Sequence, residues 1–252
     1  MNPLLLLILP PGGLIKEGSL STQNCIIQSL AALPSLHSFT ESPEPAAAEL
    51  RQLHERMQRS ESVDPKRLSD LLGVEDIEEG EGALPYIFLL SMVDALPVLA
   101  KMTCSSTLVR GVYHPPKPVH WLTPTKPERL ESLLAKSQIR FSSLPEILIL
   151  GFNKFAVSTH LPYTVLFKPL AIECPMTLTV SSTASQIYAT KCYDLCATVQ
   201  DHPFCKHSVA HIRQARSKLW YRAHNQNISL LKQKEVIDPS TWLLFYQSRK
   251  RD

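Results

Sequence analysis

The stretch of sequence that decides the fold is residues 13–34, which read GLIKEGSLSTQNCIIQSLAALP. Its second half is mostly small and apolar. The large apolar residues recur at the three- and four-residue spacing of one helix face, as Ile26, Ile27, Leu30 and Leu33. Pro34 ends the pattern, because proline has no amide hydrogen with which to continue a helix. We therefore predict a buried helix over residues 22–33.

Outward from this helix, the chain divides into a helical first half and a β-rich second half. Helical spacing or a helix-start signal predicts helices over residues 46–59, from Asp64-Pro65 onward, and over residues 84–99. After Leu130, short runs rich in β-branched and aromatic residues predict strands near residues 147–150, 163–167, 176–180, 193–199, 209–212, 219–221 and 242–246. Such segregation is typical of the α+β class and not of alternating α/β folds.

The bulk composition fits an ordinary globular protein. Of 252 residues, 44% are hydrophobic and 19% are charged. A net charge of +3 is too small to indicate nucleic acid or acidic lipid as a partner. The six cysteines contain no C-x-x-C pair, so we expect no metal site and no cofactor. The same cysteines show no secreted disulfide pattern, which predicts an intracellular location in the cytoplasm or nucleus.

The N-terminus carries an apolar run from Leu4 to Leu9 that ends at Pro10. A membrane-spanning helix needs about 20 apolar residues, so this run is too short. It also lacks the basic flank and the cleavage site of a signal peptide. We expect a packed N-terminal arm over residues 1–12, with attachment to mitochondria or another membrane as the alternative.

The opening stretch resembles the first motif of the ubiquitin-specific proteases, G-L-x-N-x-G-N-T-C-[FY]-M-N-S-x-L-Q-x-L-x-x-x-P. These are papain-like cysteine proteases that cut after the C-terminus of ubiquitin. An alignment without gaps keeps family residues at Gly13, Leu14, Gly18, Asn24, Gln28, Leu30 and Pro34. Further segments resemble later family motifs in the family order, at residues 82–96, 144–155, 206–212, 220–228 and 243–246.

This resemblance covers nearly the whole chain and implies a single domain with the papain-like fold of the family. The helical half over residues 13–100 would be thumb-like, and the antiparallel β-rich half over residues 144–252 palm-like. Between them, residues 101–143 are much shorter than the family's finger region, which grips ubiquitin and often carries two C-x-x-C pairs. We expect reduced fingers there, with residues 103–127 as a Pro-rich loop because they show no clear period.

The resemblance also assigns site positions, and most of them have changed. The nucleophile position holds Ser21, and the position of the oxyanion-stabilising asparagine holds Lys16. The family's histidine base matches His207, whereas the residue that orients it falls on His224, or on Asn225 one residue later. A serine hydroxyl does not ionise as a cysteine paired with histidine does, and losing one oxyanion donor typically costs about 10²–10³ in rate.

These departures imply a catalytically inactive homologue that acts as a binding or scaffold protein. Its partner would be ubiquitin, a ubiquitin-like protein or another protein.

Two alternatives keep a catalytic function. Cys25 follows Asn24 as the family cysteine follows its own Asn-Thr pair, but choosing Cys25 shifts the alignment by four residues. Four residues are about one helical turn, so Cys25 is expected below Ser21, pointing into the core. The alternative function is an active deubiquitinase or isopeptidase for a ubiquitin-like modifier that uses Cys25, or that lost its cysteine at position 21 by engineering. A serine hydrolase built on Ser21, His207 and Asn225 lacks a nucleophile-elbow motif.

Overall fold

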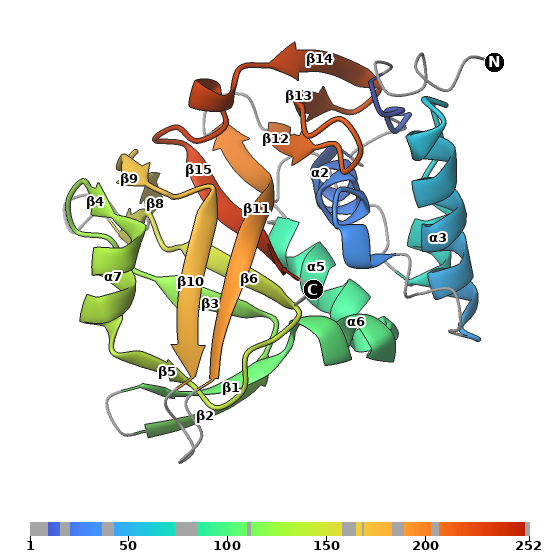
Figure 1. Cartoon of the computed structure of the whole chain (residues 1–252). Coiled ribbons are helices and arrows are strands. Elements are labelled where there is room, and N and C mark those ends of the chain that lie inside the picture. Colours follow the sequence, from blue (N-terminus) through green and yellow to red (C-terminus); the bar gives the residue numbers. More distant parts are fainter. Residues whose placement is uncertain are drawn as a thin grey trace. The chain divides into compact units, whose positions relative to one another are not determined.

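The computed structural model describes most of the chain, over residues 10–15, 21–36, 43–73, 85–109, 112–157, 165–167, 169–182, 189–202 and 207–249. The chain splits into two compact and discontinuous units. Unit 1 combines residues 1–102 with residues 196–236. Unit 2 combines residues 103–195 with residues 237–252. Figure 1 labels the helices and strands of both units.

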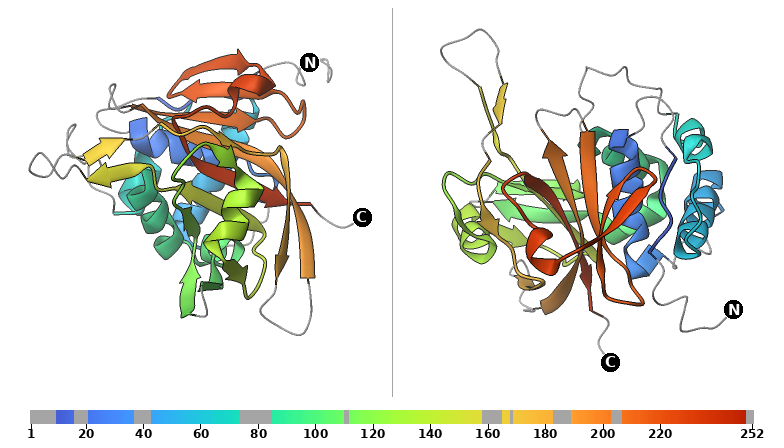
Figure 2. Two further views of the ribbon diagram at one scale, coloured as in Figure 1. Left: turned by 90° about the vertical axis from the view of Figure 1, so that its left-hand side faces the viewer. Right: turned by 90° about the horizontal axis from the view of Figure 1, so that it is seen from above.

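Unit 1 is built around one central helix. Its described helices are α2 (Ser21–Ala31), α3 (Pro45–Gln58), α4 (Lys66–Leu71), α5 (Pro85–Ala95) and α6 (Pro97–Thr103). Its strands are β12 (His207–Arg213), β13 (Trp220–His224), β14 (Asn227–Leu231) and the last part of β11 (Ala189–His202). Helix α2 packs against β12 and β13 and also contacts α3 and α5 (Figure 2). It is the buried helix that the opening stretch predicts.

The predicted helix over residues 84–99 is interrupted. It consists of α5 and α6, with Leu96 between them. Pro97 causes the break, because it has no N–H to donate and is tolerated only in the first turn of a new helix. The backbone nevertheless stays helix-like here, since Leu96 N–H donates to Met92 O over 3.0 Å and Ala100 N–H donates to Leu96 O over 3.0 Å.

The strands of unit 1 form antiparallel pairs in sequence order. β11 pairs with β12 between Ala197↔Ile212 and His202↔His207, and β12 pairs with β13 between Ala210↔Ala223 and Arg213↔Trp220. β13 and β14 form a hairpin that closes at His224↔Asn227. β14 was not among the predicted strands.

Unit 2 is mostly β. One series of paired strands runs through β2 (Val112–Lys117), β1 (Ser105–Val109), β5 (Ile139–Phe141), β10 (Thr177–Ser182) and the first part of β11. A second series is β3 (Val119–Leu122), β6 (Ile147–Phe152) and β15 (Thr241–Ser248). The remaining elements are α7 (Leu130–Ser137) and the short pairs β4 (Glu128–Arg129) with β9 (Ile172–Glu173) and β7 (Phe155–Val157) with β8 (Val165–Phe167).

The prediction of a Pro-rich loop over residues 103–127 was wrong, because this segment contains β1, β2 and β3. The prolines of the segment argued against strands in the sequence. Pro115 and Pro116 nevertheless lie in β2, because β2 is an edge strand, where a missing N–H is tolerated. β3 pairs in parallel with the fully buried β6, and Trp121 lies opposite Gly151. A Cβ at Gly151 would lie 2.5 Å from the Trp121 ring, so this close approach requires glycine.

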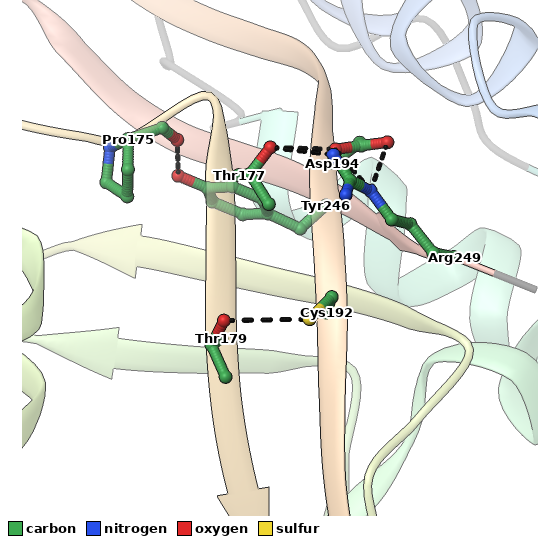
Figure 3. Close-up of polar contacts among 7 residues, drawn as sticks. All are labelled: Pro175, Thr177, Thr179, Cys192, Asp194, Tyr246 and Arg249. Carbon is green, nitrogen blue, oxygen red and sulfur yellow. Dashed lines mark hydrogen bonds and ion pairs between the residues drawn. The ribbon is translucent and has the colours of Figure 1, made fainter. Parts of the chain in front are cut away.

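The C-terminal end of unit 2 is fixed by polar contacts (Figure 3). Arg249 Nε donates to both carboxylate oxygens of Asp194 over 3.0 Å, and its Nη2 donates to Asp194 Oδ1 over 2.7 Å and to Thr177 Oγ1 over 3.1 Å. The Tyr246 hydroxyl donates to Pro175 O over 2.7 Å. These contacts tie β15 and the residue that follows it to β10, to β11 and to the segment before β10.

Most of the described helices precede most of the described strands along the chain, which confirms the α+β prediction.

Candidate functional site

The predicted nucleophile position lies at the start of α2. Ser21 is the first residue of this helix, and its side chain falls outside the described part of the structure. Lys16, at the predicted oxyanion position, also lies outside the described residues. The site therefore has to be built from the neighbours of these two positions.

Cys25, the alternative nucleophile, lies one turn into α2. It is 1% exposed and belongs to the core of unit 1. Its backbone carbonyl accepts a hydrogen bond from Ser29 Oγ over 2.7 Å. Cysteine is among the residue types most often found buried, where it packs as a small apolar side chain.

Asn225 lies at the centre of a buried polar network in unit 1. It occupies the turn between β13 and β14 with a φ of 56°, a left-handed conformation that asparagine tolerates better than most residues. Its Oδ1 accepts from Asn24 Nδ2 over 2.9 Å. Its backbone oxygen accepts from Gln28 Nε2 over 2.7 Å and from Leu14 N–H over 3.1 Å. One residue therefore joins the hairpin turn to α2 and to the N-terminal segment.

The N-terminal segment is held closely from two sides. Val63 N–H donates to Gly13 O over 3.0 Å, and Ile15 N–H donates to Val63 O over 2.8 Å. On the other side, a Cβ at Gly13 would lie 2.5 Å from Gln226 Cα, so only glycine fits against the hairpin turn. The family-like residues Gly13 and Leu14 are thus the ones that meet Asn225 and Gln226.

The two histidines of the predicted site lie at the same end of neighbouring strands. His207 begins β12 and His224 ends β13, and these strands pair next to that end at Ala210↔Ala223. Because the strands are antiparallel, the start of β12 and the end of β13 both face the β13–β14 turn. His224 is half-buried, whereas the side chain of His207 is outside the described part.

The side-chain oxygen of Asn225 already has a structural contact. Orienting a histidine requires an acceptor for a ring N–H, and this oxygen, which can accept two hydrogen bonds, already accepts one from Asn24. Asn24 and Gln28 also leave one buried amide oxygen each without a hydrogen-bond donor among the described groups. Sequence comparison marked Asn24 and Gln28 only as matches to a motif and gave no sign of their contacts with Asn225.

Metal chemistry has no support in the described part of the chain. No cluster of three or more His, Cys, Asp or Glu side chains there is arranged to hold an ion.

The model of one protein family, ubiquitin carboxyl-terminal hydrolase, matches residues 13–246. The chain belongs to this family. The match covers both units and includes every position of the predicted site. A comparison with curated proteins gave no match.

Solved structures agree with the family fold. A SAGA Ubp8/Sgf11/Sus1/Sgf73 DUB module contains a chain that matches with a TM-score of 0.69 and 16% identity, over 96% of this chain and 68% of that one. The same module bound to ubiquitin aldehyde matches with a TM-score of 0.68 and 17% identity, over 96% and 70%. A yeast SAGA DUB module that carries a point mutant of Sgf73 matches with a TM-score of 0.67 and 17% identity, over 96% and 69%. The predicted fold of the ubiquitin-specific protease type is therefore confirmed.

At such low sequence identity, the similarity to these structures bears on the fold alone.

No helix in the described part combines the length and the apolar character that crossing a membrane requires.

Proposed function

We propose that this chain is a catalytically inactive member of the ubiquitin carboxyl-terminal hydrolase family that acts by binding another protein. The observation that carries the proposal is the burial of Cys25. A cysteine nucleophile must reach the carbonyl carbon of its substrate, and a side chain with 1% exposure inside the core is not presented to one. The start of α2, where the family carries its nucleophile, has Ser21 instead.

The neighbouring positions support the same conclusion. Lys16 replaces a neutral amide donor with a long cation at the oxyanion position, where preorganised donors normally supply a large part of the rate. His224 stands where the family has a residue that accepts from the catalytic histidine. Asn225, the other candidate, has its side-chain oxygen engaged by Asn24 over 2.9 Å.

The frame that remains is well suited to binding. The buried network around Asn225 joins the N-terminal segment, α2 and the hairpin turn. Two of the similar structures are described as bound to ubiquitin aldehyde and to monoubiquitin. We therefore propose ubiquitin as the first partner to test, ahead of ubiquitin-like proteins and of unrelated partners in a complex. We further propose that the chain works as a single domain in an intracellular compartment.

Steady-state hydrolysis of a fluorogenic amide at the ubiquitin C-terminus tests the loss of catalysis. We expect no turnover above the buffer rate from the unmodified protein, from Cys25→Ser or from Ser21→Cys, because the oxyanion and orienting positions have changed as well. Turnover by the unmodified protein that Cys25→Ser abolishes would overturn the proposal. The exposed Cys192 provides the matched control, since Cys192→Ser removes a thiol far along the chain from α2.

Calorimetric titration with ubiquitin then tests the binding role. We expect saturable binding with one site per chain. The absence of any ubiquitin binding by a correctly folded sample would exclude ubiquitin as the partner.

A further inference from the structure

Two of the edge strands in the described part of the chain differ in how they are protected. β2 is an edge strand in unit 2 and carries Pro115 and Pro116. β14 is the edge strand of unit 1 (Figure 1), and no described strand pairs with its outer side. Natural edge strands are usually blunted by proline or by charged residues within the strand. β14 (Asn227–Leu231, sequence NISLL) contains neither.

β14 and its neighbour also expose large apolar side chains. Leu230 is 68% exposed, and Leu219, directly before β13, is 43% exposed. The sheet register places Leu230 opposite the buried Tyr221. An apolar side chain on an unpaired strand edge is a feature that soluble proteins generally avoid unless another chain covers it.

The surroundings of β14 are strongly basic although the whole chain has a net charge of only +3. Residues 213–235 contain six Lys or Arg residues against one Glu. Arg222 lies opposite Ser229 of β14 and is exposed, and Lys232 directly follows the strand and is exposed. Neither forms an ion pair with a described carboxylate.

We propose that the outer edge of β14 binds an extended acidic segment of a partner protein by strand addition. The unpaired backbone groups of β14 would form the new ladder, and this recognition mode takes its specificity from alternate side chains. Because side chains alternate between the two faces of a strand, apolar side chains of the segment would lie on the face of Leu230 and its carboxylates on the face of Ser229 and Arg222. Lys232 would add positive charge just beyond the end of the strand. A nucleic acid or a lipid surface would match the charge but would leave the backbone groups of the strand unpaired. The inference goes beyond the proposed function, because it holds whether or not the chain cleaves ubiquitin.

Fluorescence anisotropy with a labelled heptapeptide of alternating Val and Glu tests the proposal on the full chain. We expect saturable binding that Leu230→Lys weakens at least tenfold, because a charge on an edge strand opposes strand addition. Arg222→Glu and Lys232→Glu are each expected to weaken it severalfold and to reduce its dependence on salt. Val112→Lys, a change on the exposed edge strand β2, serves as the matched control and is expected to leave the affinity unchanged. Circular dichroism checks that every variant is folded.

Several outcomes would overturn the proposal. One is the absence of peptide binding by the unmodified protein, and another is equal weakening by Leu230→Lys and Val112→Lys. A peptide in which lysine replaces glutamate should not bind, and a peptide in which proline replaces each valine should not bind either, so binding of either peptide contradicts acidic strand addition. Binding to phosphatidylserine vesicles in place of the peptide, or self-association in sedimentation that Leu230→Lys abolishes, would assign the edge to a different occupant.

Discussion

At the scale of the residue, Asn225 explains how the site region keeps its shape. It accepts hydrogen bonds from Asn24, Gln28 and Leu14 while it holds a φ of 56°. The contact with Asn24 joins residues 201 positions apart in sequence. No local pattern predicts such a contact, which is why the sequence identified the positions of the site but not what holds them together.

Replacing Asn225 separates its two roles. Asn225→Ala leaves the buried Asn24 amide without its acceptor and replaces asparagine by a residue that tolerates a positive φ less well, so we expect a loss of about 2–4 kcal/mol in the free energy of unfolding. Asn225→Gly removes the side-chain contact but suits the backbone, so its loss should be smaller by about 1 kcal/mol. Urea unfolding measures both. Gln138→Gly, at a similar φ of 54° but exposed, gives the backbone effect alone, and an Asn225→Ala variant as stable as the native chain would contradict the role of the network.

His120, in unit 2, makes the stability of the fold depend on pH in the acid range. Its ring Nε2 lies 2.9 Å from Ser105 Oγ, and the ring packs edge-on against Phe141. Burial, with a smaller contribution from Lys117, lowers the pKa of His120 to about 4. As the pH falls, His120 becomes protonated near pH 6.5 in the unfolded chain but only near pH 4 in the folded chain. The free energy of unfolding therefore decreases as the pH drops through this range.

The matching experiment compares the native chain with His120→Gln by urea unfolding at pH 7 and pH 4.5. From pH 7 to pH 4.5, the native chain should lose up to about 3 kcal/mol more free energy of unfolding than the variant. A difference that stays constant over this range would show that His120 titrates normally in the folded state.

At the scale of the element, the sequence predicted best what local periodicity determines. α2 and α3 follow their apolar patterns, with Leu50, Leu53 and Met57 buried along one face of α3. The missed strands include β1, β2, β3, β5 and β14, because strands depend on partners far along the chain and the sequences of these strands alternate only weakly. The break at Pro97 was visible in the sequence, but the apolar run on both sides of it obscured the boundary.

A buried lysine helps to hold the turn that precedes β15. Lys154 Nζ donates to Pro239 O over 2.8 Å and to Thr241 O over 2.6 Å. Burial lowers the pKa of Lys154 to about 8, although nearby Cys174 and Asp238 favour its charged form. As the pH rises, Lys154 loses its proton near pH 8 in the folded chain but only near pH 10.5 in the unfolded chain. The free energy of unfolding therefore increases as the pH rises from about 8 toward 10.

Unfolding of the native chain and of Lys154→Met at pH 7.5 and pH 9.5 measures this effect. We expect the stability difference to move in favour of the native chain at the higher pH, by at most about 1.4 kcal/mol per pH unit. Lys136→Met, which changes an exposed lysine, controls for the loss of a positive charge as such. A slope of the opposite sign would mean that the folded state holds the ammonium form more tightly than water does.

At the scale of the whole molecule, we propose that the family frame is kept while the family chemistry is lost. Residues 13–246 match the family, and the fold matches that of the deubiquitinating module. The residues that keep the frame, such as Gly13 and Asn24, lie in close packing and buried hydrogen bonds. In the alignment with the family motifs, the positions proposed to carry the chemistry hold Ser21, Lys16 and His224 instead. The sequence predicted that Cys25 points into the core, and the packing of α2 confirms this with a side chain that is 1% exposed.

The most direct test of the loss of catalysis is the reaction of the native chain with ubiquitin that carries a cysteine-reactive electrophile at its C-terminus. Intact-mass spectrometry after prolonged incubation should show the mass of the unmodified chain alone. Ser21→Cys, run in parallel, reports whether a thiol at the start of α2 can be reached. A shift of the native chain by the mass of one ubiquitin, lost in Cys25→Ser, would contradict the account.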